Sequence, residues 1–211
     1  MKTIKTITIL TVLVLFQNGI RAQKLKNQIV KSISQMEESY TAIEDDRKMM
    51  LNQLASRIFR DSKNQENTNV VFIDRHNKER SQLAAIWLRT GLMYYGLHRY
   101  TVRSAGTEII QEPISALNSL EEYGFKVSNA GGKEPYSYNV KSGSEKWKVK
   151  YKNYEALHLN DEAVIKIYVE KGIVSEDEAK QIEVFLSSPE SIAREMLYVS
   201  SRIKFLREKL Q

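Results

Sequence analysis

The hydrophobic positions of this chain follow two different spacings in turn. Over residues 24 to about 60, apolar side chains recur every three or four positions, which is typical of one face of an α-helix. Residues 70–73 are instead an unbroken apolar run between polar segments, which indicates a strand buried on both faces. The helical spacing returns over residues 81 to about 95, and Gly96 follows at a position where glycine commonly ends a helix.

The rest of the chain continues this alternation. The pattern predicts strands at 100–103, 125–127, 135–140, 146–151 and 163–169, and helices at 113–123, 175–186 and 191 to about 209. Strands that alternate with helices predict an α/β fold, with an open, mostly parallel sheet and flanking helices on both faces. We therefore expect an N-terminal helical segment at 23–62 and an α/β domain at 68–211.

The first 22 residues have the composition of a secretory signal peptide. Lys2 and Lys5 precede a short apolar run at 7–16, and Ala22 is the small residue that favours cleavage. The apolar run is shorter than the ~20 residues that a membrane-spanning helix needs. We expect an exported protein, periplasmic or secreted, with no stable membrane span after the signal peptide is removed.

Charge and cysteine content exclude several classes of partner and chemistry. The full chain of 211 residues carries a net charge of +6, and removing residues 1–22 leaves +3, because that stretch holds three cations and no acid. The charges are mixed along the chain, so we expect no nucleic-acid partner. The chain contains no cysteine, which excludes disulfides and every cysteine-based chemistry. We expect no cofactor and no metal site, since the acidic clusters read as solvated helix faces.

The candidate chemistry lies where the first buried strand meets the following helix. In open α/β sheets, ligands bind beyond the carboxyl ends of the strands. Residues 74–81 (DRHNKERS) and residues 104–108 (SAGTE) both follow such ends, so we expect the two loops to meet. Loop amides and a helix N-terminus attract an anion there, and Arg80 can bind two oxygens of a tetrahedral oxyanion.

This arrangement resembles the low-molecular-weight phosphotyrosine phosphatases and their arsenate reductase relatives, in particular exported bacterial members. Further similarity lies in Gly124-Phe125, Glu134-Pro135-Tyr136 and residues 194–199. The resemblance implies the phosphatase-like fold, with Asp74 at the position of the nucleophilic cysteine, Arg80 as the anion clamp, and Glu170 as a stand-in for the general acid. A second alignment places Ser188-Pro189 at the acid position and leaves no general acid. It also implies an anion-binding loop of Arg75, His76, Asn77, Lys78, Glu79, Arg80 and Ser81, supported by Ser104.

The aspartate at the cysteine position changes the expected activity. A carboxylate and a bound oxyanion ~4 Å apart repel each other by about 4 kcal/mol at an effective dielectric constant of about 20. We therefore expect a catalytically impaired protein that binds an oxyanion, a phosphorylated ligand or a protein partner weakly. One alternative is an active phosphatase that uses Asp74 as phosphoryl acceptor, aided by Mg²⁺. The other is an interaction module that docks through its N-terminal helix.

Individual residues in and near the loop admit more than one role. Arg80 either binds an anion or pairs with Asp74. Asn77 is best explained as structural, in a left-handed conformation held by Ser81 and Ser104, whereas His76 is either a base or a solvent-facing side chain. Residues 146–152 (KWKVKYK) place their lysines on one strand face. The preferred interpretation is a solvated face, and the alternative is a basic patch for acidic partners.

Overall fold

The computed structural model of the chain describes residues 25–63, 66–108, 110–160, 164–173 and 182–210. The expected signal peptide at 1–22 lies outside these residues and stays a prediction. No helix among the described residues is long and apolar enough to cross a membrane.

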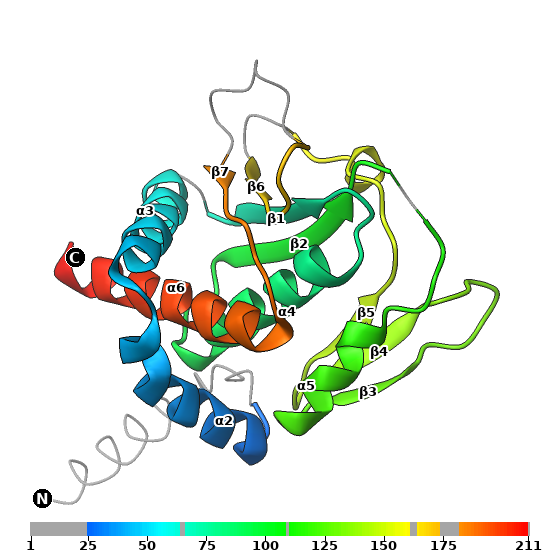
Figure 1. Ribbon diagram of the computed structural model, residues 1–211, viewed down its shortest axis with the longest axis horizontal. Coiled ribbons are helices and arrows are strands. Elements are labelled where there is room, and N and C mark those ends of the chain that lie inside the picture. Colours follow the sequence, from blue (N-terminus) through cyan, green and yellow to red (C-terminus); the bar gives the residue numbers. More distant parts are fainter. Residues whose placement is uncertain (1–24, 64–65, 109, 161–163, 174–181, 211) are drawn as a thin grey trace, which may run out of the picture.

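A four-stranded parallel sheet forms the centre of the molecule (Figure 1). Its strands stand in the order β2-β1-β6-β7, with bounds β2 (Tyr100–Gly106), β1 (Thr68–Asp74), β6 (Val164–Tyr168) and β7 (Ile182–Glu183). Every side chain of residues 70–73 is at most 1% exposed, as expected of a strand buried on both faces. The predicted parallel sheet with flanking helices is confirmed.

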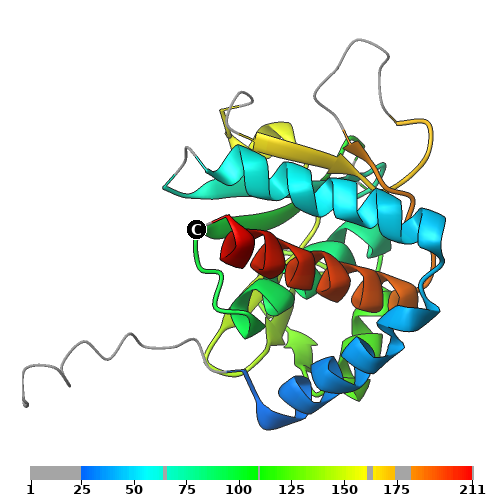
Figure 2. The same ribbon diagram turned by 90° about the vertical axis from the view of Figure 1, so that its left-hand side faces the viewer.

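Three long helices cover one face of this sheet. They are α3 (Asp45–Ser62), α4 (Glu79–Tyr94) and α6 (Pro189–Lys209). They pack with Val70 and Phe72 in one apolar core, and α4 lies directly under β1 and β2. Figure 2 shows α3 and α6 running side by side along this face. Pro189 at the first turn of α6 and the capping box between Ser188 and Ser191 start this helix two residues earlier than predicted.

The opposite face is covered differently. Val71, Ile73, Ala105 and Tyr168 form a smaller apolar cluster there, against the short 3₁₀-helix η3 (Glu155–Leu157) and the residues next to it. We expected helices on both faces, but the described part of the chain places its α-helices on one.

The N-terminal helical pattern divides into two α-helices. α2 (Asn27–Glu38) continues into the 3₁₀-helix η1 (Ser39–Ala42), and the chain becomes extended at Ile43 and Glu44 before α3 begins. The apolar stripe of both helices is buried against the rest of the molecule, with Ile29, Ile33, Leu51, Leu54 and Ile58 all at most 1% exposed. These five side chains are therefore packed within the chain, whereas Val30, Met49 and Met50 on the same two helices remain exposed.

A second, antiparallel sheet lies beside the first (Figure 1). It contains β3 (Lys126–Asn129), β4 (Tyr138–Lys141) and β5 (Lys146–Val149), after η2 (Ser115–Asn118) and α5 (Ser119–Glu122). β4 and β5 form the predicted hairpin. The helix predicted at 113–123 is shorter in the structure, which has a 3₁₀-helix at Ser115–Asn118 followed by an α-helix at Ser119–Glu122.

The helix predicted at 175–186 is wrong at its described end. Residues 182–183 form strand β7, and Val184 and Leu186 donate their main-chain N–H groups to Tyr168 and Val169. Ile182, Val184 and Leu186 alternate with polar or exposed residues, which is the period of a strand. Residues 175–181 lie outside the described part.

Candidate anion-binding site

The candidate site is the loop that joins β1 to α4. Asp74 is the last residue of β1, and its carboxylate points back into the loop. Oδ1 accepts a hydrogen bond from the main-chain N–H of Lys78 at 3.2 Å, and Oδ2 accepts one from the main-chain N–H of Ser81 at 3.0 Å. These donors are of the kind expected to bind an external oxyanion. Here they bind the side chain of the chain's own Asp74.

The surroundings of Asp74 favour the neutral form of its carboxyl group. The residue is 3% exposed, and burial raises its pKa above the usual value, while hydrogen bonds from Ser81, Lys78 and Asn77 offset part of that rise. No described lysine or arginine lies within ion-pair distance of Asp74. The ionised carboxylate is therefore stabilised by hydrogen bonds alone.

Asn77 holds the loop in shape from inside. It is fully buried and has a φ of 52°, in the left-handed region that asparagine tolerates better than most residues. Its Nδ2 donates to Ser81 Oγ at 3.1 Å, and its Oδ1 accepts from Lys152 N at 2.9 Å and from Gln82 Nε2 at 3.0 Å. Ser104 does not reach Asn77 directly, since its Oγ donates to Gln82 Oε1 at 2.8 Å.

Gln82 is the residue that sequence reasoning missed. Its amide joins Asn77, Ser104 and the main-chain carbonyl of Lys150, to which Nε2 donates at 3.0 Å. A polar side chain on an otherwise apolar helix face was the available signal, because a buried amide must find partners.

The SAGTE segment meets the loop, as expected from its place after β2. A Cβ atom added to Gly106 would lie 2.6 Å from Asn77 N and 2.8 Å from His76 C, so only glycine allows this approach. Glu108 N donates to Arg75 O at 2.7 Å and Thr107 N to Asp74 O at 3.3 Å. The two loops thus support each other through their main chains.

Arg80 is not engaged with Asp74. Its Nε is buried and has no hydrogen-bond partner among the described residues, and its guanidinium lies 5.5 Å from the centre of the Phe185 ring. Of the two roles open to Arg80, this position favours a clamp for an external anion over a pair with Asp74.

Asp74, Arg80 and Glu170 all line one pocket of about 210 Å³. Glu170 follows β6, and its Oε2 accepts a hydrogen bond from Arg75 N at 3.1 Å. The fold therefore brings Glu170, the predicted acid, to the predicted nucleophile position and clamp, although Glu170 is far from both in sequence. His76 and Glu79 also line this pocket.

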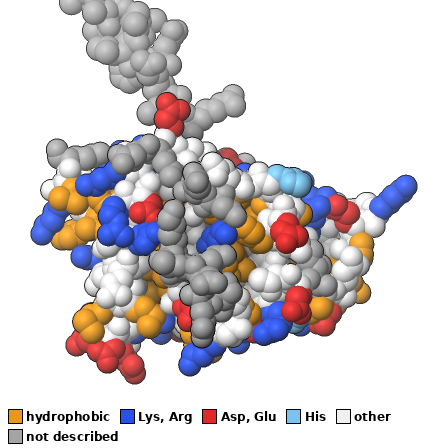
Figure 3. Space-filling model, turned by 90° about the horizontal axis from the view of Figure 1, so that it is seen from above, with side chains coloured by type: hydrophobic (Ala, Val, Ile, Leu, Met, Phe, Trp, Pro, Cys, Tyr) orange, Lys and Arg blue, Asp and Glu red, His pale blue; other side chains and the backbone are white. Residues whose placement is uncertain are grey.

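The exposed side chains of the loop form ion pairs and a hydrogen bond with the segment after β2. Arg75 lies 3.7 Å from Glu108, Lys78 pairs with Glu112 at 2.7 Å, and a ring nitrogen of His76 lies 3.2 Å from the Glu108 carbonyl. Seen from above in Figure 3, basic, acidic and apolar side chains are interspersed over the surface. No group of three or more histidine or acidic side chains among the described residues is placed to hold a metal ion.

Neither a model of a known protein family nor a curated protein matches the sequence. Solved structures that resemble the chain include two arsenate reductases. One is a thioredoxin-dependent arsenate reductase from Corynebacterium glutamicum, with 18% identity and a TM-score of 0.36 over 100% of this chain and 98% of that one. The other is an arsenate reductase in the phosphate binding state, with 18% identity and a TM-score of 0.39 over 68% of this chain and 99% of that one. Values this low assign no activity to the present chain.

Proposed function

We propose that this chain is a phosphatase-like protein without phosphatase catalysis, which binds an oxyanion or a phosphorylated ligand weakly beside Arg80. The observation that carries the proposal is the position of the Asp74 carboxylate, which accepts the loop hydrogen bonds of Lys78 and Ser81 itself. An external oxyanion must compete with this carboxylate for the same donors and is repelled by its charge.

Protonation of Asp74 changes that competition. The neutral carboxyl group no longer repels an anion, and it gains an O–H that can donate a hydrogen bond to one. Because burial raises the pKa of Asp74, this form persists to a higher pH than in an exposed aspartate. Arg80, whose Nε has no described partner, then supplies the fixed positive charge. Oxyanion affinity should therefore increase as the pH falls.

Sulfate binding measured by calorimetry at about pH 4.5 and about pH 7.5 tests this proposal, since sulfate keeps its double charge at both values. Wild-type protein should bind sulfate more tightly at the lower pH. Asp74→Ala should bind it at both values with a smaller pH dependence than wild type, because His76, Glu79 and Glu170 remain in the pocket, and Arg80→Ala should bind it poorly at both. Arg60→Ala removes an exposed arginine from α3 and serves as the matched control. Equal binding by wild type at the two pH values would contradict the proposal.

A second candidate function is an aspartate-based phosphatase. It is favoured by one observation, the presence of Asp74 and Glu170 in the same pocket. Hydrolysis of p-nitrophenyl phosphate, with and without Mg²⁺, distinguishes the two functions. Turnover by wild type that is absent from both Asp74→Ala and Glu170→Gln would establish the enzyme, and no turnover in any of the three proteins is the outcome expected here.

A further inference from the structure

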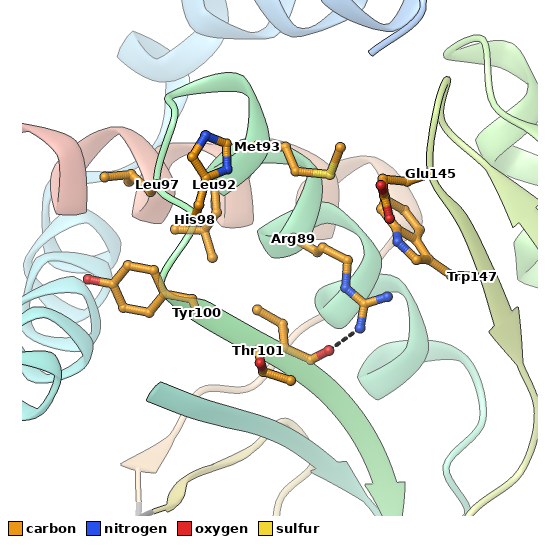
Figure 4. Close-up of a pocket in the computed structure, with 10 residues that line it drawn as sticks. Arg89, Leu92, Met93, Leu97, His98, Tyr100, Thr101, Glu145 and Trp147 are labelled. Carbon is orange, nitrogen blue, oxygen red and sulfur yellow. Dashed lines mark hydrogen bonds between the residues drawn. The ribbon is translucent and has the colours of Figure 1, made fainter. Parts of the chain in front are cut away.

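A pocket of about 280 Å³ lies at the end of α4 remote from the Asp74 loop, between the starts of β2 and β5. Figure 4 shows this Arg89 pocket, in which Arg89 extends from α4 toward β2 and Glu145 and Trp147 lie on the β5 side. Pockets that bind small molecules commonly occupy roughly 300–1,000 Å³. The volume therefore suits a ligand at the small end of that range.

Arg89 is held in place within this pocket and still has donors to offer. Its Nη2 donates to the Val102 carbonyl, and its guanidinium lies 4.9 Å from the centre of the Trp147 ring. Its other two nitrogens, Nε and Nη1, form no hydrogen bond with any described residue. Burial, with the neighbouring Arg103, lowers the pKa of Arg89 to about 10. A carboxylate bound at Nε or Nη1 would therefore stabilise a charge that burial disfavours.

Glu145 supplies the opposite charge on the β5 side of the same pocket. Its carboxylate forms no ion pair with a lysine or arginine in the described part of the chain. Glu145 is close enough to favour the charged form of Arg89 through space, but the two side chains do not form an ion pair. A ligand that carries both a carboxylate and an ammonium group would complement the two charges together.

Apolar side chains form another part of the pocket wall. Leu92 and Leu97 belong to the main apolar core and are at most 3% exposed, so their positions are fixed before a ligand arrives. The hydroxyl groups of Tyr100 and Ser62 lie 3.0 Å apart and share a hydrogen bond, which leaves the ring of Tyr100 for the pocket. His98 lines the pocket as well and is exposed. A preformed apolar wall beside two separate charges suits a zwitterion with an apolar side group.

We propose that the Arg89 pocket binds a free amino acid with an apolar side chain, such as leucine. The ligand carboxylate accepts hydrogen bonds from Arg89, the ligand ammonium group binds the carboxylate of Glu145, and the ligand side chain contacts the apolar wall. This site is separate from the Asp74 loop and does not depend on it, since the two lie at opposite ends of α4. An inorganic oxyanion fits poorly here, because it has no cation for Glu145 and is repelled by it.

Tryptophan fluorescence provides the measurement. The chain has two tryptophans, of which Trp87 is 1% exposed in the core and Trp147 lines the pocket. Titration of wild-type protein with L-leucine should change the emission saturably, and Trp147→Phe should abolish the change. Isocaproate lacks the ammonium group of leucine and isopentylamine lacks its carboxylate. Each should bind at least about tenfold more weakly than leucine, because one charge in the pocket then has no partner.

Glu145→Gln tests the assigned role of the carboxylate. This variant should bind leucine about tenfold more weakly than wild type, whereas it should bind isocaproate no more weakly, since isocaproate has no ammonium group to lose a partner. A change that acted only through the fold would weaken both ligands alike. Glu183→Gln is the matched control, because it removes an exposed carboxylate from β7 at the other edge of the parallel sheet, and it should bind leucine as wild type does.

Several outcomes would overturn the proposal. One is the absence of leucine binding to wild-type protein in both fluorescence and calorimetry. Another is equal affinity for leucine and its two one-charge analogues, which would leave the pocket an apolar hollow without charge recognition. Equal weakening of leucine and isocaproate in Glu145→Gln would remove the assigned role of that carboxylate. Loss of the leucine response in Arg80→Ala would place the binding at the Asp74 loop instead.

Discussion

The Asp74 loop and the β2–β5 groove, the space lined by Arg89, Arg103, Trp147 and Lys152, differ in how their charges are compensated. The loop offers main-chain donors to an anion and already contains one, the carboxylate of Asp74. The groove gathers Arg89, Arg103 and Lys152 and contains no carboxylate that pairs with Arg103 or Lys152 among its described residues. The carboxylate of the loop is therefore stabilised within the chain. In the groove, Arg89 bonds the Val102 carbonyl and stacks on Trp147, whereas the charges of Arg103 and Lys152 have no paired carboxylate among the described residues.

This contrast bears on stability as well as on binding. Residues that satisfy one another contribute to folding, and residues retained for a ligand commonly cost stability while the ligand is absent. Substitutions in the loop network should therefore weaken the fold, and suitable substitutions in the groove should strengthen it. Two substitutions and one pH dependence test that difference, and the expected change in the free energy of unfolding decreases from the first to the last.

The largest effect is expected from Asn77→Ala. This change leaves Lys152 N without its acceptor and Ser81 Oγ without its donor, and it places alanine at a φ of 52°. Gln82 Nε2 loses one of its acceptors but keeps the carbonyl groups of residue 77 and Lys150. Buried donors without partners cost about 1–3 kcal/mol and the left-handed conformation about 1 kcal/mol, so the free energy of unfolding should fall by about 3 kcal/mol. Urea denaturation at neutral pH measures this loss.

Asn77→Gly separates the two contributions. Glycine adopts the left-handed conformation without strain but restores none of the hydrogen bonds. It should therefore be more stable than Asn77→Ala by about 1 kcal/mol. A loss below about 1 kcal/mol in both variants would show that the loop does not depend on this network.

Much of this loop could be predicted from the sequence. Asn77 lies in the short loop between a strand and a helix, where the backbone can adopt only a few conformations. Because asparagine tolerates the left-handed one, its positive φ could be predicted from local rules. The meeting of residues 74–81 with residues 104–108 followed from the parallel sheet alone. Gln82 was missed because its partners come from three segments, which only the folded chain brings together.

The groove could not be predicted in the same way. The alternation of lysines at 146–152 indicated a basic strand face, but its neighbours Arg89 and Arg103 belong to other elements. The strand at 182–183 was misread for a related reason. Its partner is the distant strand β6, and the residues after it, Val184 and Leu186, donate to the carbonyl groups of Tyr168 and Val169. A short apolar run does not by itself distinguish a helix from a strand.

The second prediction concerns the pH dependence of stability. The folded-state pKa of Asp74 is raised above 3.8, chiefly by burial, so the folded chain keeps this proton to a higher pH than the unfolded chain does. The stability contributed by the protonated form is complete below 3.8 and is lost as the pH rises through the folded-state pKa. The loss should be smaller than that in Asn77→Ala, because the hydrogen bonds of Lys78 and Ser81 offset part of the cost of burial.

Asp74→Ser provides the reference, since serine accepts a hydrogen bond but does not titrate in this range. The free energy of unfolding of wild type, relative to this variant, should decrease from acidic to neutral pH in urea denaturation experiments. An increase over the same range would mean that the loop stabilises the ionised carboxylate more than burial penalises it. Asp74 would then resemble a tightly held internal anion, and the proposed competition with an external oxyanion would lose its pH dependence.

The smallest effect is expected from Lys152→Met, and it has the opposite sign. Burial, with the nearby Arg89, Lys150 and Arg103, lowers the pKa of Lys152 below 10.5, so its charge costs stability at neutral pH. This cost declines as the pH rises from the folded-state pKa to 10.5. Methionine keeps the apolar stem and removes the charge, so stability at neutral pH should rise by about 0.5 kcal/mol. Lys31→Met, on the exposed side of α2, should change nothing measurable. A gain in stability would show that the charge of Lys152 is a net cost to the folded chain. A loss of stability would mean that the lysine stem and its contacts outweigh the repulsion, and the groove would then be satisfied within the chain, as the Asp74 loop is.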